Sequence, residues 1–449
     1  MTDQSLPQFV DDEAAAPPRP IRATPRSTPR AVVEPAPETR RWFWSTLDGY
    51  LLLIVGVLLA VGLMMVYSTT FDWSYQVWGS PATVFMQHVR NVAIGGVLLI
   101  LLALIDYRRW RRLAVLLLLV TIGTLIAVLL FGDDTFGARR ALVRGSFQPG
   151  ELAELIIVVY MAAWLTSRRT QIRSIAYGLI PFGVLVAIVA GLVLLQPDIS
   201  TAATIVVVAG IMFFLAGADL RQLAVAGAAV AVIGVLWVTR LGPDYAQGRV
   251  ESFLSGAADV TQADYHVQQA IKAFSNGGWT GVGLGQGKQK FANLPAPHTD
   301  SIFAVIGEEL GVLGAMAVVG LYVGLVVRGL QIARRAVDPF GALLAAGVTI
   351  WVATKALLNI AVMTALVPPT GAPLPFISFG GSSLVVLLVG MGLLLSVARV
   401  RTLTQLTKRV PATDRSKTVA NYDYGWRDRR ARVSRAGGGR SAEQPATGR

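Results

Sequence analysis

Residues 48–69 read DGYLLLIVGVLLAVGLMMVYST, an apolar run whose one charged residue stands at its start. A helix of about 20 residues crosses a hydrocarbon layer of roughly 30 Å, so this run is long enough to span a membrane. Similar runs recur along the chain and predict an all-α integral membrane protein with ten transmembrane helices. The predicted spans are 48–69, 84–105, 113–132, 151–167, 175–195, 199–216, 221–240, 301–327, 340–366 and 380–398.

The composition excludes an ordinary soluble protein. The 449 residues are 53% hydrophobic and 15% charged, whereas a soluble domain carries about 25% charged residues. The net charge of +13 does not indicate nucleic-acid binding, because residues 399–449 alone carry +9 of it. The chain has no cysteine, which excludes disulfides and thiolate metal sites.

The polar segments divide the chain into three parts. Residues 1–46 contain eight prolines and predict a disordered cytoplasmic arm rich in Pro and Arg. Residues 47–400 form the membrane domain, in which 241–300 is too polar to span and makes a large loop between helices seven and eight. Residues 401–449 predict a disordered, basic cytoplasmic tail, for which anionic membrane lipids are the expected partner and a cytoplasmic protein is the alternative.

The distribution of Lys and Arg predicts the orientation, since cytoplasmic loops are enriched in these residues. If the N-terminus is cytoplasmic, the short inner loops carry 11 arginines and the short outer loops carry three. Both termini are therefore expected in the cytoplasm, and the loop 241–300 is expected to face outward.

A first polar segment on the predicted outer side contains Arg139 and Arg140, followed by a proline that begins a helix with Glu151 and Glu154. Two residues three apart share one face of a helix. An arginine cluster at the bilayer surface suits a lipid-linked phosphate or pyrophosphate. Binding to ordinary lipid headgroups explains the same cluster equally well.

The outer loop supplies the second set of candidates. It contains Arg249 and Lys290 and ends in the sequence PAPHTD, which places His298 and Asp300 where the next helix begins. A carboxylate beside bound phosphate could take a proton from an attacking sugar hydroxyl. Asp is also a favoured helix N-cap, so Asp300 has a purely structural alternative. The three scattered histidines do not indicate a metal site.

Ionisable residues inside predicted spans are costly unless they are paired or solvated. Their number predicts either structural ion pairs or a polar cavity near the outer leaflet. The candidates are Arg90, Glu151, Glu154, Asp198, Glu308, Glu309 and Lys355.

Several long motifs make the chain resemble a known family. They are GARR at 137–140, FQP at 147–149, QPD at 196–198, DYHVQQA at 264–270, HTDSIFAVIGEELG at 298–311 and PLPFISFGGSS at 373–383. This set resembles the SEDS family of shape, elongation, division and sporulation proteins, and its FtsW branch more than its RodA branch. The resemblance spans about residues 48–398 and covers all ten predicted helices.

The resemblance implies a bacterial inner-membrane glycosyltransferase that polymerises lipid II into peptidoglycan at the division septum. It implies Asp300 as the general base, with inversion at the sugar and undecaprenyl pyrophosphate as leaving group. Arg139, Arg140, Arg249, Lys290 and His298 are the expected ligands of substrate and pyrophosphate. The implied partners are a class B penicillin-binding protein, which is a transpeptidase, and other division proteins. The resemblance makes no cofactor certain, and assistance by Mg²⁺ or Mn²⁺ is left open.

The chain departs from the family at two positions that bear on the predicted cavity. Glu154 stands where the family usually has lysine, and Lys355 stands where an uncharged residue is expected. One hypothesis joins the two changes: the positive charge has moved to another helix, and Glu154 pairs with Lys355.

Three other functions remain open from the sequence. They are a lipid II flippase, a non-catalytic scaffold for the penicillin-binding protein, and an elongation-type polymerase. Polar residues concentrate on the predicted outer side, which favours a polymerase over a transporter.

Overall fold

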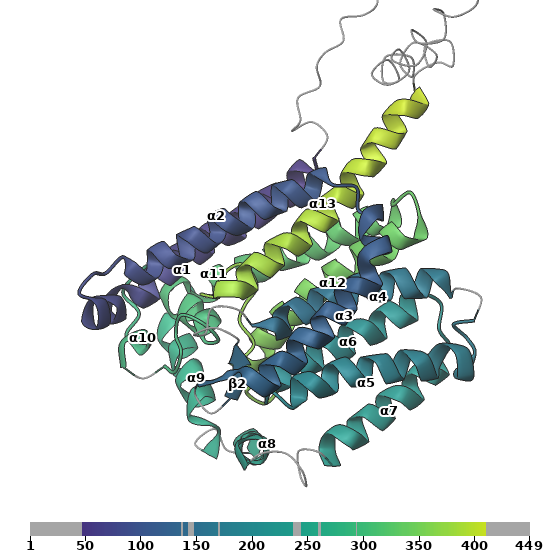
Figure 1. The fold of residues 1–449 in the computed structure, drawn as a ribbon. Helices are drawn as coiled ribbons and strands as arrows, with labels where there is room; N and C mark the ends of the chain where they lie inside the picture. Colours follow the sequence, from purple (N-terminus) through teal and green to yellow (C-terminus); the bar gives the residue numbers. More distant parts are fainter. Residues whose placement is uncertain are drawn as a thin grey trace, which may run out of the picture. The chain divides into compact units, whose positions relative to one another are not determined.

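A computed structural model describes residues 47–135, 138–141, 148–168, 171–236, 244–258, 262–292 and 294–409. The predicted N-terminal arm and the predicted tail beyond residue 409 lie outside these residues. Figure 1 shows the arrangement of the helices. In chain order the elements are α1 (Gly49–Trp78), α2 (Thr83–Leu104), α3 (Arg108–Phe131), β1 (Asp133–Thr135), β2 (Ala138–Ala141), α4 (Pro149–Ser167), a π-helical turn η2 (Ile175–Leu179), α5 (Ile180–Leu194), α6 (Ile199–Leu215), α7 (Leu220–Leu236), α8 (Asp244–Ala258), α9 (Tyr265–Gly277), α10 (Gln289–Ala292), α11 (Ile302–Arg334), α12 (Pro339–Met363) and α13 (Gly381–Arg409).

Each predicted span overlaps a helix, although residues 237–240 of the span 221–240 lie outside the described residues, and the fold is helical as expected. Within the described residues, eight helices are long and apolar enough to cross a membrane. The predicted spans 199–216 and 221–240 correspond to α6 and α7, which are apolar but have 17 residues each. α1 and α11 continue beyond their predicted ends, to Trp78 and Arg334.

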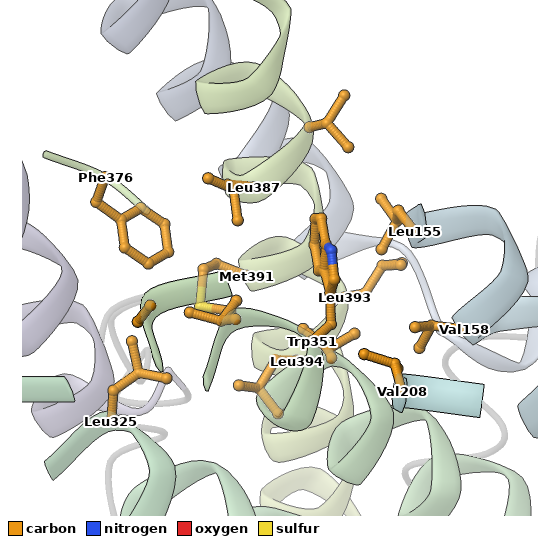
Figure 2. Close-up of a cluster of buried hydrophobic side chains, with 14 of the residues drawn as sticks. Leu155, Val158, Val208, Leu325, Trp351, Phe376, Leu387, Met391, Leu393 and Leu394 are labelled. Carbon is orange, nitrogen blue, oxygen red and sulfur yellow. The ribbon is translucent and has the colours of Figure 1, made fainter. Parts of the chain in front are cut away.

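Three helices form the centre of the bundle. The apolar segments of α4, α12 and α13 are 61–78% buried, against 28–33% for those of α1, α2, α3, α5 and α11. Figure 2 shows Trp351 of α12 packed between Leu155 of α4 and the leucines of α13. The peripheral helices leave apolar side chains exposed, as expected for surfaces that contact lipid tails.

The structure adds elements that hydropathy does not predict. β1 and β2 form a short antiparallel hairpin in the arginine-rich segment, an exception to the predicted all-α class. The predicted outer loop contains α8, α9 and α10. α13 continues to Arg409, so residues 401–409, assigned from the sequence to the disordered tail, are helical.

α11 is interrupted at Gly311, whose φ of 69° and ψ of −170° require glycine. The backbone on each side bonds to the loop that follows α9. The carbonyls of Glu308 and Glu309 accept hydrogen bonds from loop N–H groups, and the N–H groups of Val312 and Leu313 donate to loop carbonyls. This exchange fixes the loop against the helix that begins directly after Asp300.

The end of α12 remote from Asp300 is fixed by Asp338, which caps the helix through the Gly341 N–H. Tyr107 Oη donates to Asp338 at 2.5 Å and Arg108 Nε donates at 3.0 Å. Burial alone would raise the pKa of Asp338, but these three hydrogen bonds outweigh it and hold the pKa below its ordinary value of 3.8.

Candidate functional site: a carboxylate-lined cavity

A polar cavity of about 280 Å³ lies between α4, α6, α12 and the start of α13. Its charged lining consists of four carboxylates and one ammonium group, and its other polar lining is mainly hydroxyl groups. The charged residues are Glu151, Glu154, Asp198, Asp300 and Lys355. Asp300 therefore shares one cavity with four of the seven intramembrane charges predicted from the sequence.

Two helix N-termini bring acidic side chains to this cavity. α4 begins at Pro149, as predicted, and Glu151 Oε2 accepts a hydrogen bond from Ser382 Oγ at 2.7 Å. Asp198 caps α6: its Oδ1 accepts from the Thr201 N–H at 3.1 Å, and its Oδ2 accepts from Thr201 Oγ1 at 2.9 Å. Carboxylates are favourable at helix N-termini because they satisfy free N–H groups and complement the helix dipole.

The predicted contact between Glu154 and Lys355 is present. Lys355 Nζ lies 2.7 Å from Glu154 Oε2, with side chains 4% and 1% exposed. Trp351 Nε1 donates to the same oxygen at 2.9 Å. Glu154 Oε1 is buried and has no hydrogen-bond partner among the described residues. The ion pair therefore leaves one carboxylate oxygen unsatisfied beside the cavity.

The segment that contains Asp300 is held through its backbone carbonyls. The carbonyls of three successive residues accept hydrogen bonds from the α12 end and the connector to α13. The pairs are Phe379 N to His298 O at 2.8 Å, Ser378 Oγ to Thr299 O at 2.6 Å and Asn359 Nδ2 to Asp300 O at 2.7 Å. Within the described part of the chain, no group donates a hydrogen bond to the Asp300 carboxylate.

The structure corrects the capping alternative for Asp300. α11 begins at Ile302 and its N-cap is Ser301, which makes no side-chain capping hydrogen bond. Gly371, with a φ of 75°, brings the opposite wall close, since a Cβ at this position would lie 3.4 Å from Asp300 Oδ2. Asp300 faces the cavity, and its position is not explained by helix capping.

Among the predicted substrate ligands whose side chains the structure describes, Arg249, Lys290 and His298 do not line this cavity. Arg139 and Arg140 lie on β2, and their side chains fall outside the described residues. Arg249, on α8, donates from Nη1 to the carbonyl of Pro369 at 3.1 Å, in the connector that also contains Gly371.

Lys290, expected from the sequence to bind substrate or pyrophosphate, is buried in an ion pair with Glu309. Its Nζ lies 2.6 Å from Glu309 Oε1 and 2.7 Å from Ser68 Oγ, and the Lys290 and Glu309 side chains are 2% and 0% exposed. Glu308 accepts hydrogen bonds from the backbone N–H groups of Lys288 and Gln289. Glu308 and Glu309, expected as intramembrane charges, thus attach the loop 281–290 to α11. The Lys290 ammonium group takes part in this attachment through its ion pair with Glu309.

His298 is a packing residue in the structure. Its ring stacks on Trp73, with centroids 5.1 Å apart and planes at 12°, and meets Phe379 edge to face at 5.9 Å. Burial lowers the pKa of His298 below its ordinary 6.5, although the Asp300 charge opposes this, so the ring is neutral at pH 7. Burial also lowers the pKa of His266, whose Nε2 lies 2.5 Å from Ser301 Oγ.

Sequence reasoning missed the residues that position the site. Ser378 lies in the Pro/Gly-rich connector and Ser382 in the first turn of α13; both belong to the motif at 373–383, but no role is predicted from the sequence for either of them, or for Trp351. Asn359 carried a signal, because it lies one helical turn beyond Lys355 on the same face of α12. No group of three or more metal-ligating side chains occurs within the described residues.

The fold and the cavity define the class: a multi-pass membrane protein whose helices enclose a carboxylate-lined cavity next to Asp300. The chain belongs to the FtsW/RodA/SpoVE family of cell cycle proteins, whose family model matches residues 49–403.

Relatives of the chain match it over nearly their whole lengths. A probable peptidoglycan glycosyltransferase FtsW of Trichlorobacter lovleyi is 36% identical over 364 residues, which cover 80% of this chain and 95% of that protein. Stage V sporulation protein E of Bacillus subtilis is 33% identical over 356 residues, covering 78% and 97%.

Solved structures share the fold. A chain described under structural coordination of polymerization and crosslinking by a peptidoglycan synthase complex has a TM-score of 0.65 and 28% identity, covering 79% of this chain and 98% of that one. The rod shape determining protein RodA of Thermus thermophilus has a TM-score of 0.59 and 27% identity, covering 80% and 98%.

Proposed function

We propose that this protein is a peptidoglycan glycosyltransferase that polymerises lipid II into glycan strands during cell division. The observation that carries the proposal is Asp300, which faces a polar cavity within the membrane bundle of an FtsW/RodA/SpoVE family member. The names of the relatives support the same activity, and those at 36% identity carry the FtsW name.

In the proposed reaction, Asp300 takes the proton of the 4-hydroxyl of the acceptor's GlcNAc ring as the oxygen attacks the anomeric carbon of the donor. A glycosidic bond forms, and the bond between that carbon and the phosphate oxygen breaks. The electron pair leaves with undecaprenyl pyrophosphate, and the anomeric configuration inverts. The three hydrogen bonds to the carbonyls of residues 298–300 support this role because they fix the base in place.

Arg139, Arg140 and Arg249 are proposed to contact the leaving pyrophosphate, since guanidinium groups bind phosphate oxygens in pairs. The buried ion pair of Lys290 and the neutral ring of His298 favour positioning roles for those two residues. The proposed orientation places Asp300 on the extracytoplasmic side, where peptidoglycan is assembled.

The proposed partner is a class B penicillin-binding protein that crosslinks the strands at the septum, within the division machinery. A structural neighbour described as part of a complex for polymerization and crosslinking supports this pairing.

The test uses the full-length protein purified in detergent with its penicillin-binding protein and supplied with lipid II. Glycan chains and released undecaprenyl pyrophosphate are expected. A second assay places the protein in liposomes. If lipid II crosses the liposome membrane and no glycan chains form, the protein is a flippase. If neither activity is found, the scaffold function remains.

A further inference from the structure

We infer that His266 is a positioning residue for the base, because its ring N–H holds the hydroxyl of Ser301, the residue directly after Asp300. This inference rests on the proposed function and deepens it, since it names a residue of the outer loop that keeps Asp300 in place. His266 lies in the first turn of α9 and is not part of the described cavity lining. It therefore acts through Ser301 and not on the substrate itself.

Two hydrogen bonds in series connect α9 to the segment that contains Asp300. His266 Nε2 lies 2.5 Å from Ser301 Oγ, and Ser301 Oγ donates to the carbonyl of Pro295 at 2.5 Å. A hydroxyl has one proton and a carbonyl has none, so the Ser301 proton points to Pro295 and an oxygen lone pair faces His266. The Nε2 atom of His266 must therefore carry a hydrogen and donate it to Ser301.

The charges around His266 agree with a neutral ring at pH 7. Burial lowers the pKa of His266 below its ordinary 6.5; the charges of Asp300 and Asp264 oppose this shift, and the charge of Arg249 adds to it. Nε2 carries a hydrogen in the neutral tautomer that donates to Ser301, and it also carries one in the doubly protonated ring. The hydrogen bond is thus available in both charge states, as a positioning contact requires.

Ser301 forgoes a helix cap to make this contact. It is the N-cap residue of α11, a place where serine is preferred because its oxygen accepts a hydrogen bond from an N–H of the first turn. The Ser301 side chain makes no such bond, and the residue is fully buried. A serine cap contributes about 1 kcal/mol to stability. The hydroxyl is therefore committed to Pro295 and His266 although a stabilising local alternative exists.

The turn that Ser301 closes contains a strained residue. Ala296 has a φ of 44°, in the left-handed region that residues with a Cβ rarely adopt. Its carbonyl accepts hydrogen bonds from the N–H groups of Thr299 and Ser301, at 3.1 and 3.4 Å, and the carbonyl before it accepts from Ser301 Oγ. A strained conformation persists only where surrounding contacts determine it. The contacts of Ser301 therefore help to fix the turn that contains Asp300.

α9 is a firm support for this contact because it packs closely on α11. A Cβ at Gly277 would overlap the carbonyl of Gly307, so the backbones of the two helices touch at this point. α9 also has buried residues along most of its length. Asp300 is thus held on both sides: Asn359 of α12 donates to its carbonyl, and His266 of α9 holds the next residue.

The first test is polymerisation of lipid II by the full-length protein with its penicillin-binding protein. His266→Leu and Ser301→Ala should each lower kcat about 10- to 100-fold with little change in KM, because a misplaced base slows the chemical step and leaves substrate binding intact. His266→Gln should retain most of the wild-type kcat, since the glutamine amide can donate from the place of Nε2. The matched control is Ser275→Ala, which removes an exposed hydroxyl of α9 and should keep the wild-type kcat.

The double variant of His266→Leu and Ser301→Ala tests whether the two residues act together. Its kcat should equal that of the slower single variant, and losses that multiply would overturn the inference. A folded His266→Leu variant with the wild-type kcat would also overturn it, as would a His266→Gln variant as slow as His266→Leu. If His266→Leu does not fold, Ser301→Ala removes a single oxygen atom, and an unchanged kcat in that variant would overturn the inference.

The dependence of kcat on pH separates positioning from proton transfer. It should keep its shape in His266→Gln, because the amide of glutamine donates a hydrogen bond without titrating. Loss of one limb of the profile in this variant would show that His266 itself transfers protons, which contradicts a positioning role.

A last readout does not depend on catalysis. The chain has three histidines, so solid-state NMR of the ¹⁵N-histidine-labelled, full-length protein in lipid gives few ring signals, and His266→Gln identifies those of His266. At neutral pH the His266 ring should carry its hydrogen on Nε2. A ring protonated only at Nδ1 would overturn the inference even if the protein polymerises lipid II. A wild type with the expected tautomer that forms no glycan chains would instead refute the proposed function.

Discussion

Replacing Lys355 should lower the free energy of unfolding more than replacing an exposed lysine would, because it leaves the buried charge of Glu154 without its partner. In Lys355→Met the Glu154 carboxylate, 1% exposed, keeps only the Trp351 indole as a described donor. In Glu154→Gln the Lys355 ammonium loses its paired charge. Breaking one side of a buried ion pair costs about 3–5 kcal/mol, so each single variant should lose about 3 kcal/mol or more of unfolding free energy.

The double variant should be less destabilised than the sum of the two single variants, by about 2 kcal/mol or more, since no uncompensated charge remains. The assay is reversible unfolding in mixed detergent micelles, followed by circular dichroism for the wild type and all three variants. A matched control is the partly exposed pair of Arg328 and Asp48, with side chains 30% and 9% exposed, whose coupling should be about 0–1 kcal/mol. Single-variant effects that simply add at Glu154 and Lys355 would refute the reasoning.

Three further predictions concern the loop around Asp300 and the remote end of α12. Asn359→Leu should lower kcat by roughly 10- to 100-fold with little change in KM, because it frees the Asp300 backbone; an equal rise in KM would indicate a binding role instead. His298→Phe should keep most polymerase activity and His298→Ala should lose it, because the ring packs on Trp73; inactivity of the Phe variant would restore His298 as a phosphate ligand. Because the folded pKa of Asp338 is depressed, its contribution to stability is present above pH 3.8 and lost as the pH falls through the folded pKa. Asp338→Asn should therefore lower the unfolding free energy at pH 7 and weaken its dependence on pH below 3.8. The same dependence on pH below 3.8 in the variant and in the wild type would contradict this.

The membrane spans could be predicted from the sequence because hydrocarbon imposes a length and a polarity on every crossing segment. The Glu154–Lys355 contact could be predicted for a related reason, since two opposite charges buried in one membrane domain must find partners. The β1–β2 hairpin and the helices of the outer loop lack such a constraint, and short polar segments leave their pairing to tertiary contacts.

The site could be predicted in part. Asp300 and three other acidic residues do meet in one cavity with Lys355. The sequence did not predict that Lys290 Nζ lies 2.6 Å from Glu309 Oε1. These two residues are 19 apart in sequence and meet only because the loop returns to α11. The packing of His298 between Trp73 and Phe379 could not be predicted, because it depends on tertiary contacts that the sequence does not display.

The most direct test of the central claim is polymerisation of lipid II by Asp300→Asn, an isosteric change that removes the base. The account predicts a rate at least about 10²-fold below the wild type, with an unchanged unfolding temperature because no described residue bonds to this carboxylate. Glu251→Gln, which removes an exposed carboxylate from α8, should retain the wild-type rate. A folded Asp300→Asn variant that forms glycan chains at the wild-type rate would contradict the account.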